Sequence, residues 1–258
     1  MNKQHVFIGR HDGHVAVITG AGRGLGAAMA MRLAREGAAV VVNDLNKAAA
    51  QETATLIIKS GGRALANGRD VSLLAEARAL VADTQDQFGQ LDIMVNNAGI
   101  TRDALMHKME EERFDEVIRI NLKGVFNCTQ AAAAAMVPRK SGRIINISSI
   151  SAFGNVGQAN YSASKAGVIG LSKTAALELS RAAITVNVIA PGFFDTALTQ
   201  AIPDDVKARF IQRIPLKRVG APEEMAGLVA YLASDEAAYI TGQVFVMDGG
   251  LTVGLSGV

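Results

Sequence analysis

The chain has 258 residues, of which 49% are hydrophobic and 19% charged, and this length suits one sizeable α/β domain or two small ones. Its formal net charge is only +2 with both signs spread along the chain, which argues against nucleic acid or an anionic membrane as partner. The single cysteine, Cys128, excludes an internal disulfide framework and is interpreted as a core residue, and the lack of a signal peptide or long apolar run predicts a cytoplasmic protein.

Strand-like apolar runs alternate with helix-like segments along the chain. The strand-like runs are residues 14–20, 38–44, 63–71, 91–99, 142–149, 183–192 and 242–250. The helix-like segments are residues 27–37, 47–62, 73–89, 103–138, 159–180 and 221–234. The strands are continuously apolar, as expected when helices cover both faces of a sheet. The pattern predicts a single α/β domain over 1–258, a doubly wound Rossmann-type fold with a mainly parallel seven-stranded sheet.

Two segments stand outside this alternation. Residues 1–13 are interpreted as an N-terminal extension, and its His11 and His14 have no second ligand cluster at metal spacing, so no metal site is predicted. Residues from about 193 to 220 interrupt the alternation of strands and helices, beyond the carboxyl end of a strand. Such an insertion favours a substrate lid, with a simple surface excursion as the alternative.

A glycine-rich turn joins the first strand to the first helix. Its glycines are Gly20, Gly22, Gly24 and Gly26. Glycine allows close backbone approach to a pyrophosphate, and the N-terminus of the following helix favours negative charge. Asp44 ends the second strand twenty residues beyond Gly24, where a carboxylate can bind the adenosine ribose hydroxyls and repel a 2′-phosphate. Asp44 therefore predicts NAD, although Arg23 beside the glycines keeps NADP as the alternative.

Tyr161 and Lys165 stand among small side chains in VGQANYSASKAG (156–167). In a helix, residues four apart lie on one face, so the phenol and the ammonium can meet. Reduction of a ketone by hydride requires a proton donor for the new alkoxide, and a phenol with a pKa of about 10 is protonated at neutral pH. In the reverse reaction, a nearby ammonium would help the phenol to release its proton. An exposed pair without a catalytic role is the alternative reading.

Four motifs in this order resemble the short-chain dehydrogenase/reductase family over residues 12–250. They are T-G-x-x-x-G-x-G at 19–26, NNAG at 96–99, Y-x-x-x-K at 161–165 and PG at 191–192. The resemblance implies that one set of residues binds the cofactor: Gly20, Arg23, Gly24, Leu25, Gly26, Asp44, Asp70, Val71, Asn97, Ala98, Gly99, Tyr161, Lys165, Pro191, Gly192, Phe194 and Thr196.

The resemblance also implies the catalytic set Asn121, Ser149, Tyr161 and Lys165. Tyr161 would donate the proton, Lys165 would also hold the nicotinamide ribose, and Asn121 would link that lysine to solvent through water. Counting forward from the strand assigns the catalytic serine to Ser149, whereas the usual family spacing to the tyrosine assigns it to Ser148. We favour Ser149, because the strand determines where its end points while the following loop can absorb a one-residue deletion.

Within the family, NNAGITRD, GQANYSASKAG, ITVNVIAPGF and SDEAAYITGQ are most similar to 3-oxoacyl-[acyl-carrier-protein] reductases. The expected reaction is reduction of a 3-oxoacyl thioester, carried by acyl-carrier protein or CoA, to the 3-hydroxyacyl thioester. An NAD-dependent dehydrogenase of a secondary alcohol or hydroxyacyl-CoA in catabolism is the alternative, and a non-catalytic NAD-binding scaffold is a third. The resemblance also implies a homotetramer.

Overall fold

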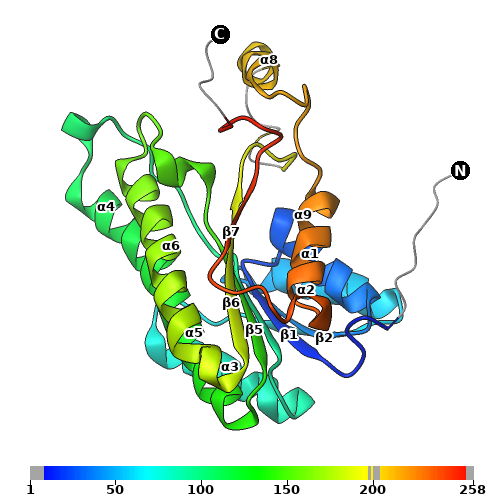
Figure 1. Ribbon diagram of the computed structural model, residues 1–258. Helices are drawn as coiled ribbons and strands as arrows, with labels where there is room; N and C mark the ends of the chain where they lie inside the picture. The colour runs from blue at the N-terminus through cyan, green and yellow to red at the C-terminus, as the bar shows by residue number, and fades with distance from the viewer. Residues whose placement is uncertain (1–8, 197–198, 200–203, 254–258) are drawn as a thin grey trace, which may run out of the picture.

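The computed structural model of the chain describes residues 9–196, 199 and 204–253. Its centre is one seven-stranded sheet with the order β3-β2-β1-β4-β5-β6-β7 (Figure 1). The strands are β1 (Val15–Thr19), β2 (Ala39–Asn43), β3 (Arg63–Asn67), β4 (Ile93–Asn96), β5 (Gly142–Ile147), β6 (Ile184–Pro191) and β7 (Val244–Met247). Every pairing between them is parallel, which confirms the predicted doubly wound α/β fold.

Helices cover both faces of this sheet (Figure 1). One layer contains α1 (Gly24–Arg35), α2 (Lys47–Lys59) and α9 (Pro222–Leu232). The other contains α3 (Leu74–Phe88), α4 (Glu111–Val117), α5 (Gly124–Met136) and α6 (Ala159–Leu179). Alternate side chains of β1 enter different cores, Ile18 beside Met29 of α1 and Val17 beside Leu80 of α3. The continuous apolar strands thus serve two cores at once.

The helix expected from residue 103 begins later and is interrupted. Residues 103–110 form a loop with a short 3-10 turn, η1 (Met106–Lys108), and α4 starts at Glu111. Glu111 and Glu112 in its first turn suit the positive end of the helix dipole. A π-helical segment, η2 (Ile118–Lys123), then separates α4 from α5. The boundary at residue 103 was therefore wrong, because the mixture of apolar and polar residues in this loop also fits a helical pattern.

The structure describes only part of the N-terminal extension and of the expected lid, the two segments that lie outside the alternation of strands and helices. Residues 9–13 of the expected N-terminal extension pack on the domain, where His11 Nε2 lies 3.0 Å from the carbonyl oxygen of Ala230. The expected lid contains α8 (Asp204–Arg213), which lies above the carboxyl ends of the strands (Figure 1). Residues 197–198 and 200–203 of that segment lie outside the described residues. Within the described part of the chain, no helix has the length and apolarity needed to cross a bilayer.

Candidate active site

The glycine-rich turn leaves no space for a Cβ at Gly20, Gly22 or Gly26. Gly20 has a φ of +61°, and a Cβ there would lie 2.8 Å from the Cα of Ala98. A Cβ on Gly26 would lie 2.2 Å from the carbonyl oxygen of Gly20. The turn precedes the N-terminus of α1, at the point where the strand order reverses between β1 and β4. Ligands of doubly wound sheets bind at this point, so the turn fits a dinucleotide pyrophosphate.

The NNAG segment supports this turn directly. Asn97 donates its side-chain amide to the carbonyl oxygens of Thr19 at 2.9 Å and Gly20 at 3.0 Å. The hydroxyl of Thr19 in turn accepts the backbone N–H groups of Asn97 and Ala98, each at 3.0 Å. Two motifs that lie far apart in the sequence therefore form one rigid unit at the ends of β1 and β4.

Asp44 lies beside the same turn, at the carboxyl end of β2. Its carboxylate accepts the backbone N–H groups of Gly22 at 3.0 Å and Asn46 at 2.9 Å. Arg23, the other residue relevant to the cofactor's adenosine, is exposed. The turn thus has a positioned carboxylate next to it, and its arginine projects into solvent.

The remaining residues expected at the cofactor lie along the same edge of the sheet. Asp70 and Val71 follow β3, and Asp70 accepts the backbone N–H of Ser72 at 2.9 Å. Pro191 ends β6, and Gly192 follows it. Thr196 reaches the glycine turn, because its Cγ2 would lie 4.0 Å from a Cβ on Gly24.

Two of the expected cofactor residues have side chains that belong to the core. Leu25 is partly buried and packs against the core on the α1 side of the sheet. Phe194 is only 4% exposed, and its ring packs against Gly220. Because the Phe194 ring is buried in the core, only the backbone of this residue is available to contact a cofactor.

Tyr161, in the first turn of α6, meets Ser149 at the end of β5. Both side chains line the same cavity, and Ser149 acts as a hydrogen-bonding partner that lowers the pKa of the phenol. Burial outweighs this effect and raises the pKa of Tyr161 above its ordinary value, and the nearby Asp103 carboxylate raises it further. The phenol is therefore protonated at neutral pH, as a proton donor must be.

Lys165 lies one helical turn beyond Tyr161, as its spacing predicted. Its Nζ is 5.6 Å from the centre of the Tyr161 ring and donates a hydrogen bond to the carbonyl oxygen of Ile147 at 2.8 Å. The side chain is 3% exposed, and burial lowers its pKa to about 8. The predicted lowering of the tyrosine pKa by this ammonium is not seen, because burial dominates the pKa of Tyr161.

Asn121 lies in the π-helical segment and is fully buried. It exchanges two hydrogen bonds with the backbone of Ile100, at 2.8 and 2.9 Å, and donates a third to Ser164 at 3.2 Å. A Cβ on Gly99 would lie 3.2 Å from the Asn121 Oδ1 and 3.5 Å from the Lys165 Nζ. Asn121 and Lys165 thus flank the same glycine.

The two candidate serines face different surroundings. Ser149 lines a cavity together with Tyr161. Ser148 is 1% exposed and donates its hydroxyl to the backbone carbonyl of Lys165 at 2.8 Å. The geometry favours Ser149 as the residue that meets a substrate, while Ser148 ties β5 to α6.

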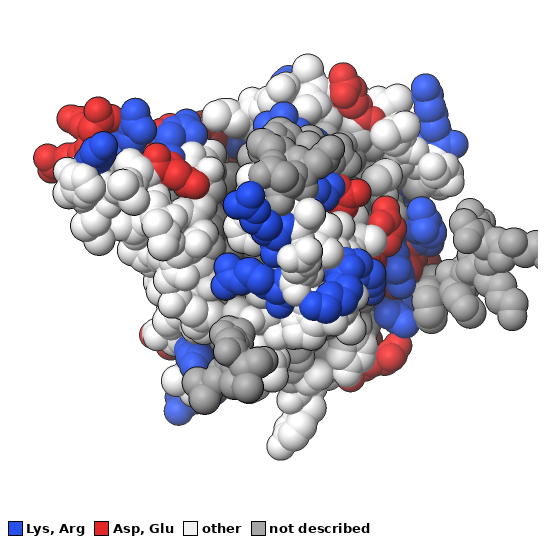
Figure 2. Space-filling model, turned by 90° about the horizontal axis from the view of Figure 1, so that it is seen from above, with Lys and Arg blue, Asp and Glu red and all other residues white. Residues whose placement is uncertain are grey.

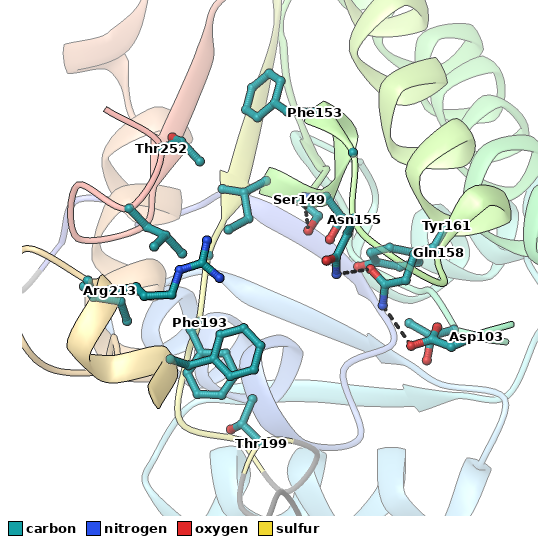
Figure 3. A pocket seen from close by; sticks show the side chains of 18 residues that line it. Asp103, Ser149, Phe153, Asn155, Gln158, Tyr161, Phe193, Thr199, Arg213 and Thr252 are labelled. Carbon is teal, nitrogen blue, oxygen red and sulfur yellow. Dashed lines mark hydrogen bonds between the residues drawn. The ribbon is translucent and has the colours of Figure 1, made fainter. Parts of the chain in front are cut away.

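The cavity beside Tyr161 has a volume of about 720 Å³. Its apolar wall consists of Ile150, Phe153, Phe193, Phe210, Ile214 and Leu251. Phe193 and Phe210 stack with ring centres 5.4 Å apart. Figure 3 shows Asp103, Gln158 and Asn155 in a hydrogen-bonded row on the Tyr161 side and Arg213 on the other side. Asp103 and Arg213 were not predicted as site residues: Asp103 ends the segment NNAGITRD, to which no side-chain role was assigned, and Arg213 lies outside the quoted motifs.

Four basic residues lie far from this cavity. Arg139, Lys140 and Arg143 lie at the start of β5, and Arg181 precedes β6, so all four are at the opposite end of the sheet from the cavity. Arg139 pairs with Asp92 at 2.8 Å. These residues are thus remote from the cavity of their own chain.

Sequence comparisons relate this chain to known proteins. The sequence matches the family described as "Enoyl-(Acyl carrier protein) reductase" over residues 20–252. It is 48% identical over 238 residues to the 3-oxoacyl-[acyl-carrier-protein] reductase FabG of Staphylococcus epidermidis, covering 92% of this chain and 98% of that protein. The protein of the same name from Staphylococcus aureus strain N315 is also 48% identical, over 92% of this chain and 97% of its own. That from Thermotoga maritima is 44% identical over 249 residues, 95% of this chain and 100% of its own.

Proposed function

Because the chain belongs to the short-chain dehydrogenase/reductase family, whose members use a nicotinamide cofactor, we propose that it reduces a 3-oxoacyl thioester to the 3-hydroxyacyl thioester. The carrier is acyl-carrier protein or CoA. The observation that carries this proposal is the large cavity that Ser149 and Tyr161 line together, with the Lys165 ammonium beside the Tyr161 ring.

When bound, a reduced nicotinamide cofactor would supply the hydride that the keto carbon of the substrate needs. The hydroxyls of Ser149 and Tyr161 hold the keto oxygen, and Tyr161 gives its proton to that oxygen as the carbon–oxygen double bond becomes a single bond. Lys165 supplies positive charge beside the phenol and holds the nicotinamide ribose. Asn121 links this lysine to solvent through water, so that the proton can be replaced.

We propose NAD as the cofactor. The Asp44 carboxylate lies against the glycine turn, where it would accept bonds from ribose hydroxyls and repel a 2′-phosphate. Measurement of kcat/KM with NADH and NADPH tests this preference. An enzyme at least about tenfold better with NADPH would overturn it.

Asp44 also favours a second candidate, an NAD-dependent dehydrogenase of a secondary alcohol or hydroxyacyl-CoA in catabolism. A panel of 3-oxoacyl thioesters, 2-enoyl thioesters and simple ketones, with the corresponding alcohols in the reverse direction, separates the two. Preference for 3-oxoacyl thioesters supports the reductase. Oxidation of secondary alcohols or hydroxyacyl-CoA with NAD that is faster than reduction of 3-oxoacyl thioesters would replace it with the second candidate.

A further inference from the structure

The cavity beside Tyr161 has charges of opposite sign on opposite walls. Among the described residues that line it, only Asp103 and Arg213 carry charge. Asp103 accepts a hydrogen bond from Gln158 at 3.0 Å and is close enough to Tyr161 to raise the pKa of the phenol. Arg213 ends α8 on the other side, and its guanidinium points into the cavity (Figure 3).

Arg213 has no hydrogen bond or ion pair with any residue that the structure describes. Neighbouring cations differ in this respect, since Arg218 pairs with Glu224 at 2.7 Å and Lys217 donates to the carbonyl oxygen of Gln212. The wall next to Arg213 is apolar and includes Phe210, three residues before Arg213, and Ile214, which follows it directly. An arginine in such a wall offers several donors in a planar fork that suits carboxylate or phosphate oxygens.

The surrounding surface also favours an anion. Viewed from above, towards α8, Lys and Arg side chains gather near the middle of the face (Figure 2). Exposed cations of this region include Arg209, Arg213, Lys217 and Arg218. A negatively charged substrate is drawn to this entrance, and at the wall that contains Asp103 it meets repulsion.

We propose that Arg213 is an anion-binding, specificity-determining residue, which holds a carboxylate or phosphate of the substrate across the cavity from Tyr161. The two charged walls orient the substrate, with its keto group at Ser149 and Tyr161 and its anionic group at α8. This inference deepens the proposed function and rests on it. The anion is either the phosphate of a pantetheine arm or a carboxylate at the far end of the substrate.

Three acetoacetyl thioesters that differ only in the thiol part test the proposal. One carries N-acetylcysteamine and is neutral, one carries phosphopantetheine and one carries 3-mercaptopropionate. For Arg213→Gln we expect KM to rise roughly 10- to 100-fold for at least one anionic thioester, with the neutral thioester unchanged. The anionic thioester that responds identifies the phosphate or the carboxylate.

Lys207→Gln is the matched control, because Lys207 lies on the same helix but does not line the cavity. It removes the same charge and should leave all three KM values unchanged. Arg213→Lys keeps the charge without the fork and should retain part of the preference. An equal change for neutral and anionic thioesters in Arg213→Gln, or no change in any of them, overturns the proposal.

Calorimetric binding separates this proposal from the proposed function. Phosphopantetheine and 3-mercaptopropionate are titrated without turnover into the wild type and Arg213→Gln. At least one should bind the wild type and lose affinity in the variant. If it does while none of the three thioesters is reduced, the anion site stands and the proposed reaction falls. If neither compound binds through Arg213 while the thioesters are reduced, the anion site falls alone.

Discussion

Tyr161 has the environment of a proton donor. Burial and the Asp103 carboxylate raise the pKa of its phenol, and only the influence of Ser149 lowers it. Reduction needs a phenol that is protonated before the reaction, and these influences keep the phenol protonated at neutral pH. Oxidation of an alcohol would need the opposite shift, and in this site the added positive charge of an oxidised nicotinamide would supply it.

Tyr161→Phe removes the proton donor and keeps the ring. We expect turnover to fall by about 100-fold or more, while the affinity for the cofactor stays within about twofold. Steady-state kinetics and cofactor fluorescence titration measure the two effects. Turnover equal to that of the wild type would exclude the mechanism, and a wild type that binds NAD but converts no substrate would favour the non-catalytic scaffold.

Lys165 makes the stability of the protein depend on pH, because burial lowers its pKa from 10.5 to about 8. Between these two values the unfolded chain binds more protons than the folded chain, so the free energy of unfolding rises with pH. Relative to Lys165→Met, the wild type should gain roughly 2 kcal/mol between about pH 7.5 and pH 10. Urea unfolding of both proteins at the two pH values measures this gain. A constant difference would show that the pKa of Lys165 is the same in the folded and the unfolded chain.

The glycine turn and NNAG act as one element, since Asn97 binds the carbonyl oxygens of Thr19 and Gly20. The sequence predicted both motifs, but nothing in either one indicates that the first asparagine side chain after β4 supports the turn after β1. The π-helical segment that contains Asn121 is a second feature that the sequence did not indicate. A single widened turn leaves the apolar pattern of the flanking helices almost unchanged, so a continuous helix was predicted.

Gly26→Ala tests the tight packing of the turn. Its new Cβ would lie 2.2 Å from a backbone oxygen, so the turn must shift. We expect a loss of about 1–3 kcal/mol in the free energy of unfolding and weaker cofactor binding. Gly170→Ala in α6 is the control, because no atom lies within 4 Å of its Cβ position and alanine favours a helix. Equal cofactor affinity in both variants would show that the turn tolerates the shift.

In the whole molecule, several apolar side chains remain exposed on the face formed by α4, α5 and α6. Leu177 of α6 is 79% exposed and Phe126 of α5 is 42% exposed. β7 is an edge strand with 42% exposure at Val246, and no neighbour covers its outer edge within the described residues. Exposed apolar faces and open edges favour association with further copies, which supports the proposed homotetramer.

Light scattering should therefore give a mass about four times the chain mass of 27.0 kDa. Leu177→Glu places a charge on the exposed face of α6 and should reduce the mass to that of a dimer or monomer. Leu56→Glu on α2 is the control, since this residue is also exposed at 55% but lies on the other layer. A monomeric wild type, or an unchanged mass for Leu177→Glu, would contradict assembly through these helices.

The sequence alone determined the doubly wound sheet, the glycine turn and the meeting of Tyr161 with Lys165. Each of these depends on local spacing, since apolar periodicity defines strands and helices and residues four apart share a helix face. The tertiary structure decided that Ser149 and not Ser148 meets the cavity, and that Asp103 and Arg213 lie on opposite walls of it. These relations depend on the paths of loops and on contacts between distant segments, which a local pattern does not encode.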